Sequence, residues 1–180
     1  MDLVFICFHA VTNIHSGKFV RASKYRHVFG QAAKKELCYE NLKITNNAFD
    51  SNIIQTNGKY LLVNWDALGG GAFAVIPLNE VGKAPDQVSL FRGHKGPVLD
   101  TAFDPFDDSR IVLCSDDGKI LVWKITENYS FHKWLVENEE IKDITEPEAL
   151  RLGHQRKVRK VLFHPPAQNV LASLPLPYSV

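Results

Sequence analysis

The chain has 180 residues, of which 45% are hydrophobic, so it is long enough to bury the core of one domain and too apolar to be disordered. Its 21 Lys and Arg residues balance 20 Asp and Glu residues, and a net charge of +1 gives the whole molecule no pull toward nucleic acid or an anionic membrane. Three widely spaced cysteines (Cys7, Cys38 and Cys114) argue against a disulfide framework and a zinc site, and no apolar run approaches the about 20 residues that a membrane-spanning helix needs.

The N-terminal part of the chain combines an atypical extension with a basic segment. Residues 1–15 have a short apolar stretch and no cleavage site of the kind that follows a signal peptide. The basic segment, Lys18–Lys43, carries an excess of five positive charges, and its cations are opposed only by Glu36 and Glu40. Such a run is more often an ordinary solvated face, and the alternative is a surface that docks an acidic partner.

Residues 57–78 predict a β-hairpin. An Asn-Gly turn leads into a strand at 60–65, a glycine-rich turn follows, and a second strand is expected at 72–78. The glycine triplet Gly69–Gly71 is not followed by Gly-Lys-Ser/Thr or by a helix, so we interpret it as a turn and not as a phosphate-binding loop. A short strand within 40–45 precedes the hairpin.

Four further short apolar runs follow, at 88–93, 98–104, 110–116 and 119–125, separated by turn residues at intervals of about ten residues. None of them has a helical period, so an all-β fold is expected. Residues 126–149 are polar and acidic, and they predict a solvated insertion loop.

A spaced pattern then recurs. From His94, the residues Val98, Phe103 and Pro105 lie four, nine and eleven positions on, and Val158, Phe163 and Pro165 lie at the same offsets from His154. The two copies start 60 residues apart, against the about 40 to 45 usual for a WD repeat, and the acidic insertion accounts for the excess. The pattern predicts an incomplete WD40-type β-propeller, with about two four-stranded antiparallel blades and part of a third.

In such a blade, the histidine of Gly-His can hydrogen-bond a side-chain hydroxyl, a turn aspartate and the indole N–H of a tryptophan. Here the candidates are His94, Asp117 and Trp123, with Leu113 standing where the hydroxyl is expected. The less favoured alternative is that His94 and Asp117 form an acid/base pair.

The second copy of the pattern has His154 and a hydroxyl at Ser173, but the residues after Ser173 supply neither the aspartate nor the tryptophan. Pro175 and Pro177 remove ladder hydrogen bonds from a continuing strand. Residues 174–180 therefore read as a divergent tail, and the third blade as half made.

Three stretches carry a resemblance to a known family. They are "GKFVRASKYRHVFGQAAKKELCYENLKITNNAFDSN", in which "KYRHVFGQ" is the most specific part, followed by "GGGAFAVIPL" and "GHKGPVLD". Over about Ser16–Ser173 the chain resembles the N-terminal part of the propeller of coronins, most closely the fungal type.

The resemblance implies a non-enzymatic protein without cofactor or metal, cytoplasmic and located at the actin cytoskeleton in cortical patches. Coronins bind actin filaments and, in full-length members, contact the actin-related branching complex. Neither nucleic acid nor membrane insertion is expected. Two alternatives stay open, a WD-repeat scaffold for another protein and a truncated product without independent function.

The actin-binding surface that the resemblance implies lies in the basic segment, because an actin filament presents an acidic surface. Its candidate residues are Arg21, Lys24, Arg26, Lys34, Lys35 and Lys43. The residues expected to hold the blades together are His94, Asp117, Trp123, His154 and Ser173.

Overall fold

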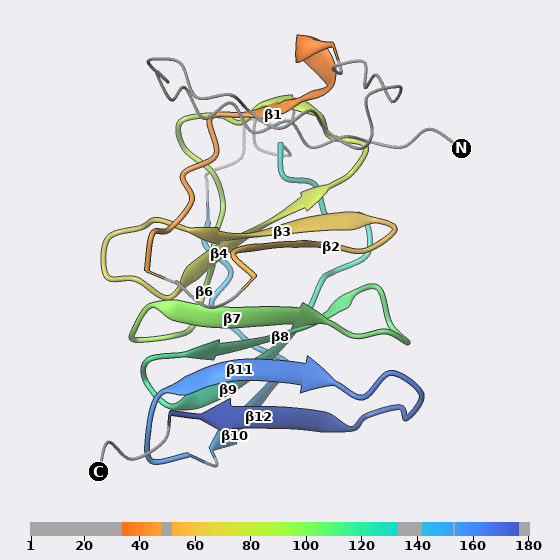
Figure 1. Ribbon diagram of the computed structural model, residues 1–180. Coiled ribbons are helices and arrows are strands. Elements are labelled where there is room, and N and C mark those ends of the chain that lie inside the picture. The colour runs from red at the N-terminus through yellow and green to blue at the C-terminus, as the bar shows by residue number, and fades with distance from the viewer. Residues whose placement is uncertain (1–33, 48–51, 133–141, 153, 177–180) are drawn as a thin grey trace, which may run out of the picture.

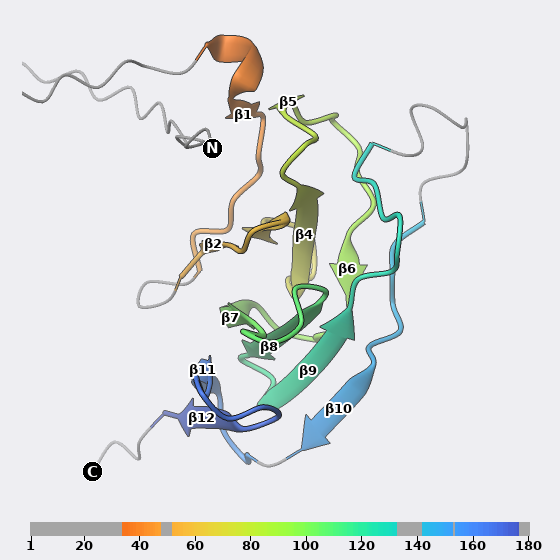
Figure 2. The same cartoon turned by 90° about the vertical axis from the view of Figure 1, so that its right-hand side faces the viewer.

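The computed structural model describes residues 34–47, 52–132, 142–152 and 154–176, and these form small β-sheets that lie one beside the next (Figure 1). In the turned view of Figure 2, the first strand of each of the two four-stranded sheets lies on the left, and the later strands follow toward the right. The all-β prediction, with four-stranded antiparallel blades, is confirmed.

The first blade is a four-stranded antiparallel sheet with the order β2-β3-β4-β6. Its strands are Ile54–Thr56, Tyr60–Trp65, Ala72–Pro77 and Phe91–Arg92. The turn between β2 and β3 forms because the side-chain oxygen of Asn57 accepts hydrogen bonds from the backbone N–H groups of Lys59 and Tyr60, at 2.8 and 2.7 Å. The predicted hairpin is confirmed as β3 and β4. β4 ends at Pro77, one residue before the predicted end of the second strand.

The turn between β3 and β4 depends on its glycines. Gly71 has a φ of 68°, and a Cβ atom at this position would lie 2.3 Å from the backbone oxygen of His94. Only glycine therefore allows the first hairpin to approach the Gly-His loop so closely. The structure gives the triplet the role of a turn, as the sequence predicted.

The second blade has the order β7-β8-β9-β10 and is also antiparallel. Its strands are Val98–Phe103, Arg110–Ser115, Lys119–Lys124 and Ala149–Leu152. Alternate side chains of its strands point to opposite faces. One face, with Ile111, Leu113 and Trp123, packs on the first blade, while Val112 and Cys114 on the other face pack on the next sheet.

The third sheet contains two described strands, β11 (Val158–Phe163) and β12 (Leu171–Pro175), paired antiparallel. Val158 and Val161 of β11 are buried against the second blade. The sheet is half of a blade, with Pro175 as the last residue of β12. No helix within the described residues is long and apolar enough to span a membrane.

A small parallel sheet joins the segment before the first blade to the loop after β4. It pairs β1 (Tyr39–Glu40) with β5 (Gly82–Lys83), and the 3-10 helix η1 (Lys35–Leu37) precedes it. The Tyr39 hydroxyl donates to the backbone oxygen of Leu78 at 3.2 Å. The strand expected within 40–45 is therefore reduced to Glu40 and an isolated bridge between Ile44 and Trp65.

The acidic insertion folds back on the first blade at both of its described ends, and we call residues 126–132 and 142–148 the strap. Phe131 is 1% exposed and packs in the core of the first blade. Its N–H and that of His132 donate to one carboxylate oxygen of Glu80, at 2.9 and 3.1 Å. The 126–132 end of the insertion therefore packs on the first blade, and the prediction of a loop surrounded by solvent alone does not hold for it.

The second half of the strap extends the edge of the first blade. Ile144 lies parallel to Phe91, donating to the Leu90 carbonyl at 2.8 Å and accepting from the N–H of Arg92 at 2.8 Å. Asp143 accepts the Leu90 N–H at 3.0 Å and pairs with Arg92 at 2.5 Å. The outer strand β6 therefore has a partner supplied by the second repeat.

Candidate functional site

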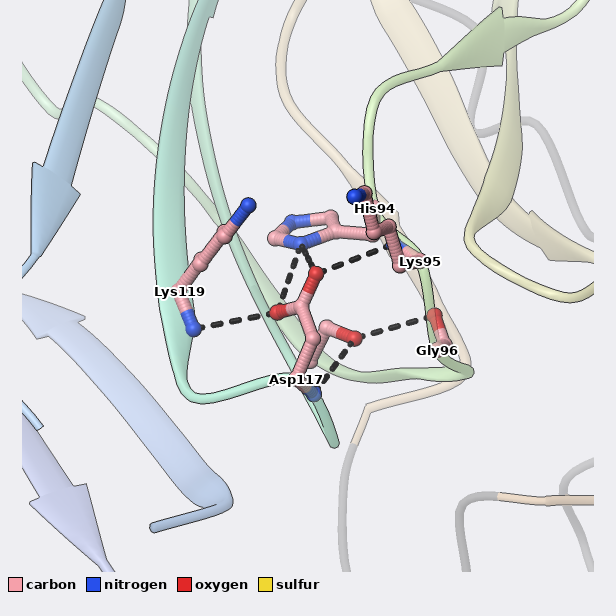
Figure 3. A network of polar contacts seen from close by, with 6 residues as sticks. His94, Lys95, Gly96, Asp117 and Lys119 are labelled. Atoms are coloured by element: carbon pink, nitrogen blue, oxygen red, sulfur yellow. Dashed lines mark hydrogen bonds and ion pairs between the residues drawn. The ribbon is translucent and has the colours of Figure 1, made fainter. Parts of the chain in front are cut away.

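The Gly-His loop meets the turn between β8 and β9 in a compact polar cluster (Figure 3). The Nδ1 atom of His94 lies 3.2 and 3.3 Å from the two carboxylate oxygens of Asp117. The same carboxylate accepts the backbone N–H groups of Lys95 and Lys119, at 2.9 and 3.0 Å. Ser115 adds a hydrogen bond from its hydroxyl to the Gly96 oxygen at 2.9 Å. The cluster ties the loop before β7 to the turn after β8.

Burial and hydrogen bonding act in opposite directions on the pKa values of this pair. It lowers the pKa of His94, although Asp117 opposes the shift, so the imidazole is neutral near pH 7. Burial alone would raise the pKa of Asp117, but the hydrogen bonds from Lys95, Lys119 and His94 outweigh it and lower that pKa overall. The His94 side chain is 1% exposed, which leaves no room for a substrate beside it and speaks against the acid/base alternative.

Trp123 packs tightly beside this cluster without a hydrogen bond to it. Its ring contacts Phe73 and Phe91, with ring centroids 5.6 and 5.5 Å apart, and a Cβ on Gly93 would lie 2.8 Å from it. The Nε1 atom of Trp123 and the Nε2 atom of His94 are both buried and have no hydrogen-bond partner among the described residues. The structure therefore brings His94 and Asp117 together but not the indole N–H.

The second Gly-His pattern makes the bond that the first one lacks. Nε2 of His154 lies 2.7 Å from the hydroxyl oxygen of Ser173. Ser173 is 19 residues after His154, and Leu113 is 19 residues after His94. The leucine at the hydroxyl position thus leaves Nε2 of His94 without a side-chain partner, and only the Leu113 backbone lies near it.

A buried carboxylate that the sequence analysis missed joins the second and third sheets. Asp100 of β7 is 1% exposed, and it accepts the N–H of Val161 in β11 at 3.1 Å. Burial raises the pKa of Asp100. A single aspartate inside an apolar run gave no spacing signal that could have singled it out.

The described part of the basic segment, residues 34–43, lies beside the first blade and belongs to none of its four strands. Lys34, Lys35 and Lys43 are all exposed, and Lys35 forms a loose pair with Glu40 at 3.8 Å. Lys43 donates from Nζ to the backbone oxygen of Asp86 at 3.3 Å. The other three candidates, Arg21, Lys24 and Arg26, lie outside the described residues.

The segment is held on the first blade by Asn41. This residue has a φ of 61°, and its side-chain amide donates to the Ala84 oxygen at 2.9 Å and to the Asp86 carboxylate at 3.1 Å. In Figure 2, η1 stands at the end of the molecule farthest from the third sheet. Lys34 and Lys35 are therefore placed on a fixed and accessible edge.

Two family models match the chain. One, described as "Domain of unknown function (DUF1899)", covers residues 18–83, and the other, "WD domain, G-beta repeat", covers residues 85–124. The first therefore includes the basic segment and the first hairpin. The second includes His94, Asp117 and Trp123.

Curated relatives extend this similarity over most of the chain. A coronin-like protein of Saccharomyces cerevisiae is 66% identical over 165 residues, which cover 92% of this chain and 25% of the relative. A coronin-like protein of Schizosaccharomyces pombe is 56% identical over 88% of this chain and 25% of its own length. Human Coronin-2A is 38% identical over 89% of this chain and 29% of its own length.

A solved structure shares the fold. The crystal structure of the WD40 domain from Toxoplasma gondii coronin superposes with a TM-score of 0.65 at 25% sequence identity, covering 75% of this chain and 32% of that one. Because the match covers only about a third of that WD40 domain, this chain corresponds to part of a propeller. The chain spans about a quarter of the length of the curated fungal relatives that it matches.

Proposed function

Since the chain belongs to the coronin family, we propose that it binds actin filaments through its basic segment and takes part in organising the actin cytoskeleton. The observation that carries the proposal is the exposure of Lys34 and Lys35 at the start of η1, which lies at an end of the described structure away from the blades (Figure 1). The side chain of Lys35 is 84% exposed, and its pair with Glu40 is of the surface kind that contributes little.

The remaining candidates, Arg21, Lys24 and Arg26, belong to the same run of sequence and add three positive charges to it. A cluster of cations steers association with an acidic surface and supplies ion pairs at the rim of the interface. For the whole protein we propose a cytoplasmic location at the actin cytoskeleton in cortical patches. Contact with the actin-related branching complex is proposed for the full-length protein alone.

Co-sedimentation of the 180-residue chain with actin filaments tests the proposal. The double variant Lys34→Glu and Lys35→Glu is expected to weaken binding by roughly tenfold, because two attractive charges become repulsive. Binding of the unsubstituted chain is expected to fall as salt rises, since the interaction is carried by exposed charges.

The matched control is Lys95→Glu with Lys124→Glu, which makes the same change in net charge at exposed positions of the second blade and its leading loop. This control is expected to pellet as the unsubstituted chain does. Equal pelleting of both double variants removes the proposed surface. A chain that captures another protein in the absence of filaments supports instead a WD-repeat scaffold.

A further inference from the structure

A groove of about 530 Å³ opens beside the first blade, between the turn that follows β3, the loop that leads into β6, and the strap. Trp65, Val88 and Leu90 line it, and all three belong to the buried core of the first blade. These three side chains are only 4–8% exposed, so they form an apolar floor that is continuous with the core, while charged and amide side chains make up six of the eleven lining residues. The groove lies away from Lys34 and Lys35, and only Lys43 is shared with the basic segment.

Leu68 stands at the rim of this groove and is 99% exposed. The next residues, Gly69 and Gly70, have φ values of 87° and 67°, so the turn holds the leucine in solvent. Covering a leucine side chain completely contributes about 1.5–3 kcal/mol. An isolated exposed leucine is ordinary, but one beside an apolar groove adds to the surface that a ligand can cover.

The charged side chains around the groove differ in whether they already have a partner. Lys43 donates to the backbone oxygen of Asp86 at 3.3 Å, and Arg92 pairs with Asp143 at 2.5 Å. The carboxylate of Asp66, which also lines the groove, makes no hydrogen bond or ion pair within the part of the chain that the structure describes. The partner of Lys43 is a neutral carbonyl and leaves its charge uncompensated. Three carboxylates, those of Asp66, Asp86 and Asp143, stand against Lys43 and Arg92 in the lining, so the groove carries one negative charge in excess.

We propose that this groove binds an extended peptide segment of a partner protein in which bulky apolar side chains flank a lysine or arginine. The apolar side chains cover Leu68 and the lining beneath it, and the cation pairs with Asp66. Interfaces of this kind take their affinity from a desolvated apolar centre and their selectivity from charge complementarity at the rim. The inference does not rest on actin binding.

The test uses the ¹⁵N-labelled 180-residue chain and two blocked pentapeptides, acetyl-Gly-Leu-Lys-Leu-Gly-amide and the same peptide with Glu for Lys. Nuclear magnetic resonance titration follows the indole N–H of Trp65 and the amide of Leu68. The lysine peptide is expected to shift both signals and to saturate within about 5 mM, whereas the glutamate peptide binds at least about tenfold more weakly.

Two variants test separately the contributions of Asp66 and Leu68 to peptide binding. Asp66→Asn is expected to weaken the lysine peptide at least about threefold and to reduce the difference between the two peptides. Leu68→Ser is expected to weaken both peptides by at least about fivefold, and it leaves the fold intact because the side chain makes no core contact.

The control is Phe106→Ser, which removes a side chain that is 48% exposed in the turn between β7 and β8, far along the chain from the groove. Binding by this variant should equal that of the unsubstituted chain. The proposal is overturned by equal affinity for the two peptides, by unchanged binding in Leu68→Ser, or by no shift at Trp65 and Leu68 with the lysine peptide. None of these outcomes depends on whether the chain pellets with filaments.

Discussion

The imidazole of His94 has a carboxylate on Nδ1 and no side-chain partner on Nε2, with only the Leu113 backbone near it, whereas the imidazole of His154 has the Ser173 hydroxyl on Nε2. A buried polar atom without a partner costs about 1–3 kcal/mol, because the water that it had in the unfolded chain is not replaced. Trp123 carries the same cost on Nε1. The repeat places position 113 where a hydroxyl could hydrogen-bond Nε2 of His94.

We expect Leu113→Thr to be more stable than Leu113→Val by about 1 kcal/mol. Threonine and valine have nearly the same volume, so the two variants differ mainly in whether a hydroxyl or a methyl group stands at this position. At an ordinary core site the hydroxyl is the worse of the two, since it is buried without a partner. Urea denaturation followed by tryptophan fluorescence measures the difference.

Position 62 is the matched control, because Leu62 is as fully buried as Leu113 and belongs to the same core cluster. There Leu62→Val should be the more stable of the pair. If valine is also favoured at position 113, the unpaired Nε2 of His94 is not served by a hydroxyl from that strand.

The sequence predicts most of the strands well, but it does not predict the short length of β6 or the contacts of the strap. The strand predicted at 60–65 is observed with those bounds, and the runs at 98–104, 110–116 and 119–125 form strands that each end one residue earlier. These strands could be predicted because short apolar runs and the turn residues that bound them are local signals. β6 keeps only Phe91 and Arg92 of the run at 88–93. Val88 and Leu90, which precede β6, are buried in the core without belonging to a strand.

The strap was misjudged because its composition is acidic while its contacts depend on a few apolar residues. Tyr129, Phe131 and Ile144 pack on the blades, and the carboxylates of Glu80 and Asp143 accept backbone N–H groups. Aromatic residues at 129 and 131 were the signal available in the sequence. The partner strand β6 lies more than 50 residues away from Ile144, so no local pattern could have shown the pairing.

We expect Phe131→Ala to destabilise the chain by about 3–5 kcal/mol, because it removes a fully buried aromatic side chain from the core of the first blade. Limited proteolysis should cut the strap faster in this variant, since Phe131 is its main anchor. Chemical denaturation gives the change in stability.

Phe106→Ala is the matched control, with the same change in size at a position that is 48% exposed. Its cost should stay below about 1 kcal/mol. Similar losses for the two variants mean that the strap contributes no more than a surface loop does.

At the scale of the molecule, each blade is completed by its neighbours. The first blade takes an outer partner from the strap of the second, and Asp100 of the second blade holds β11 of the third sheet. This sharing is what propeller architecture requires, since a single four-stranded sheet cannot bury both of its faces alone. The sequence predicted the repeat and the number of blades, but not these links between blades, which depend on contacts across the fold.

The third sheet leaves one of its faces without a cover among the described residues. Leu162 and Leu174, on the face of β11 and β12 that points away from the second blade, are 58% and 59% exposed. β12 also has no strand on its outer side in the part of the chain that the structure describes. An apolar face with a free strand edge is a template for pairing with another chain.

We therefore expect the 180-residue chain to self-associate as its concentration rises from about 10 to about 300 µM, as measured by sedimentation velocity. The double variant Leu162→Lys and Leu174→Lys should sediment as a monomer over the same range, because two charges on this face repel a second copy. Leu68→Ser, which removes a leucine that is 99% exposed in the turn after β3, should associate as the unsubstituted chain does. If Leu68→Ser abolishes association and the lysine pair does not, the copies meet at the groove of the first blade and not at the open third sheet.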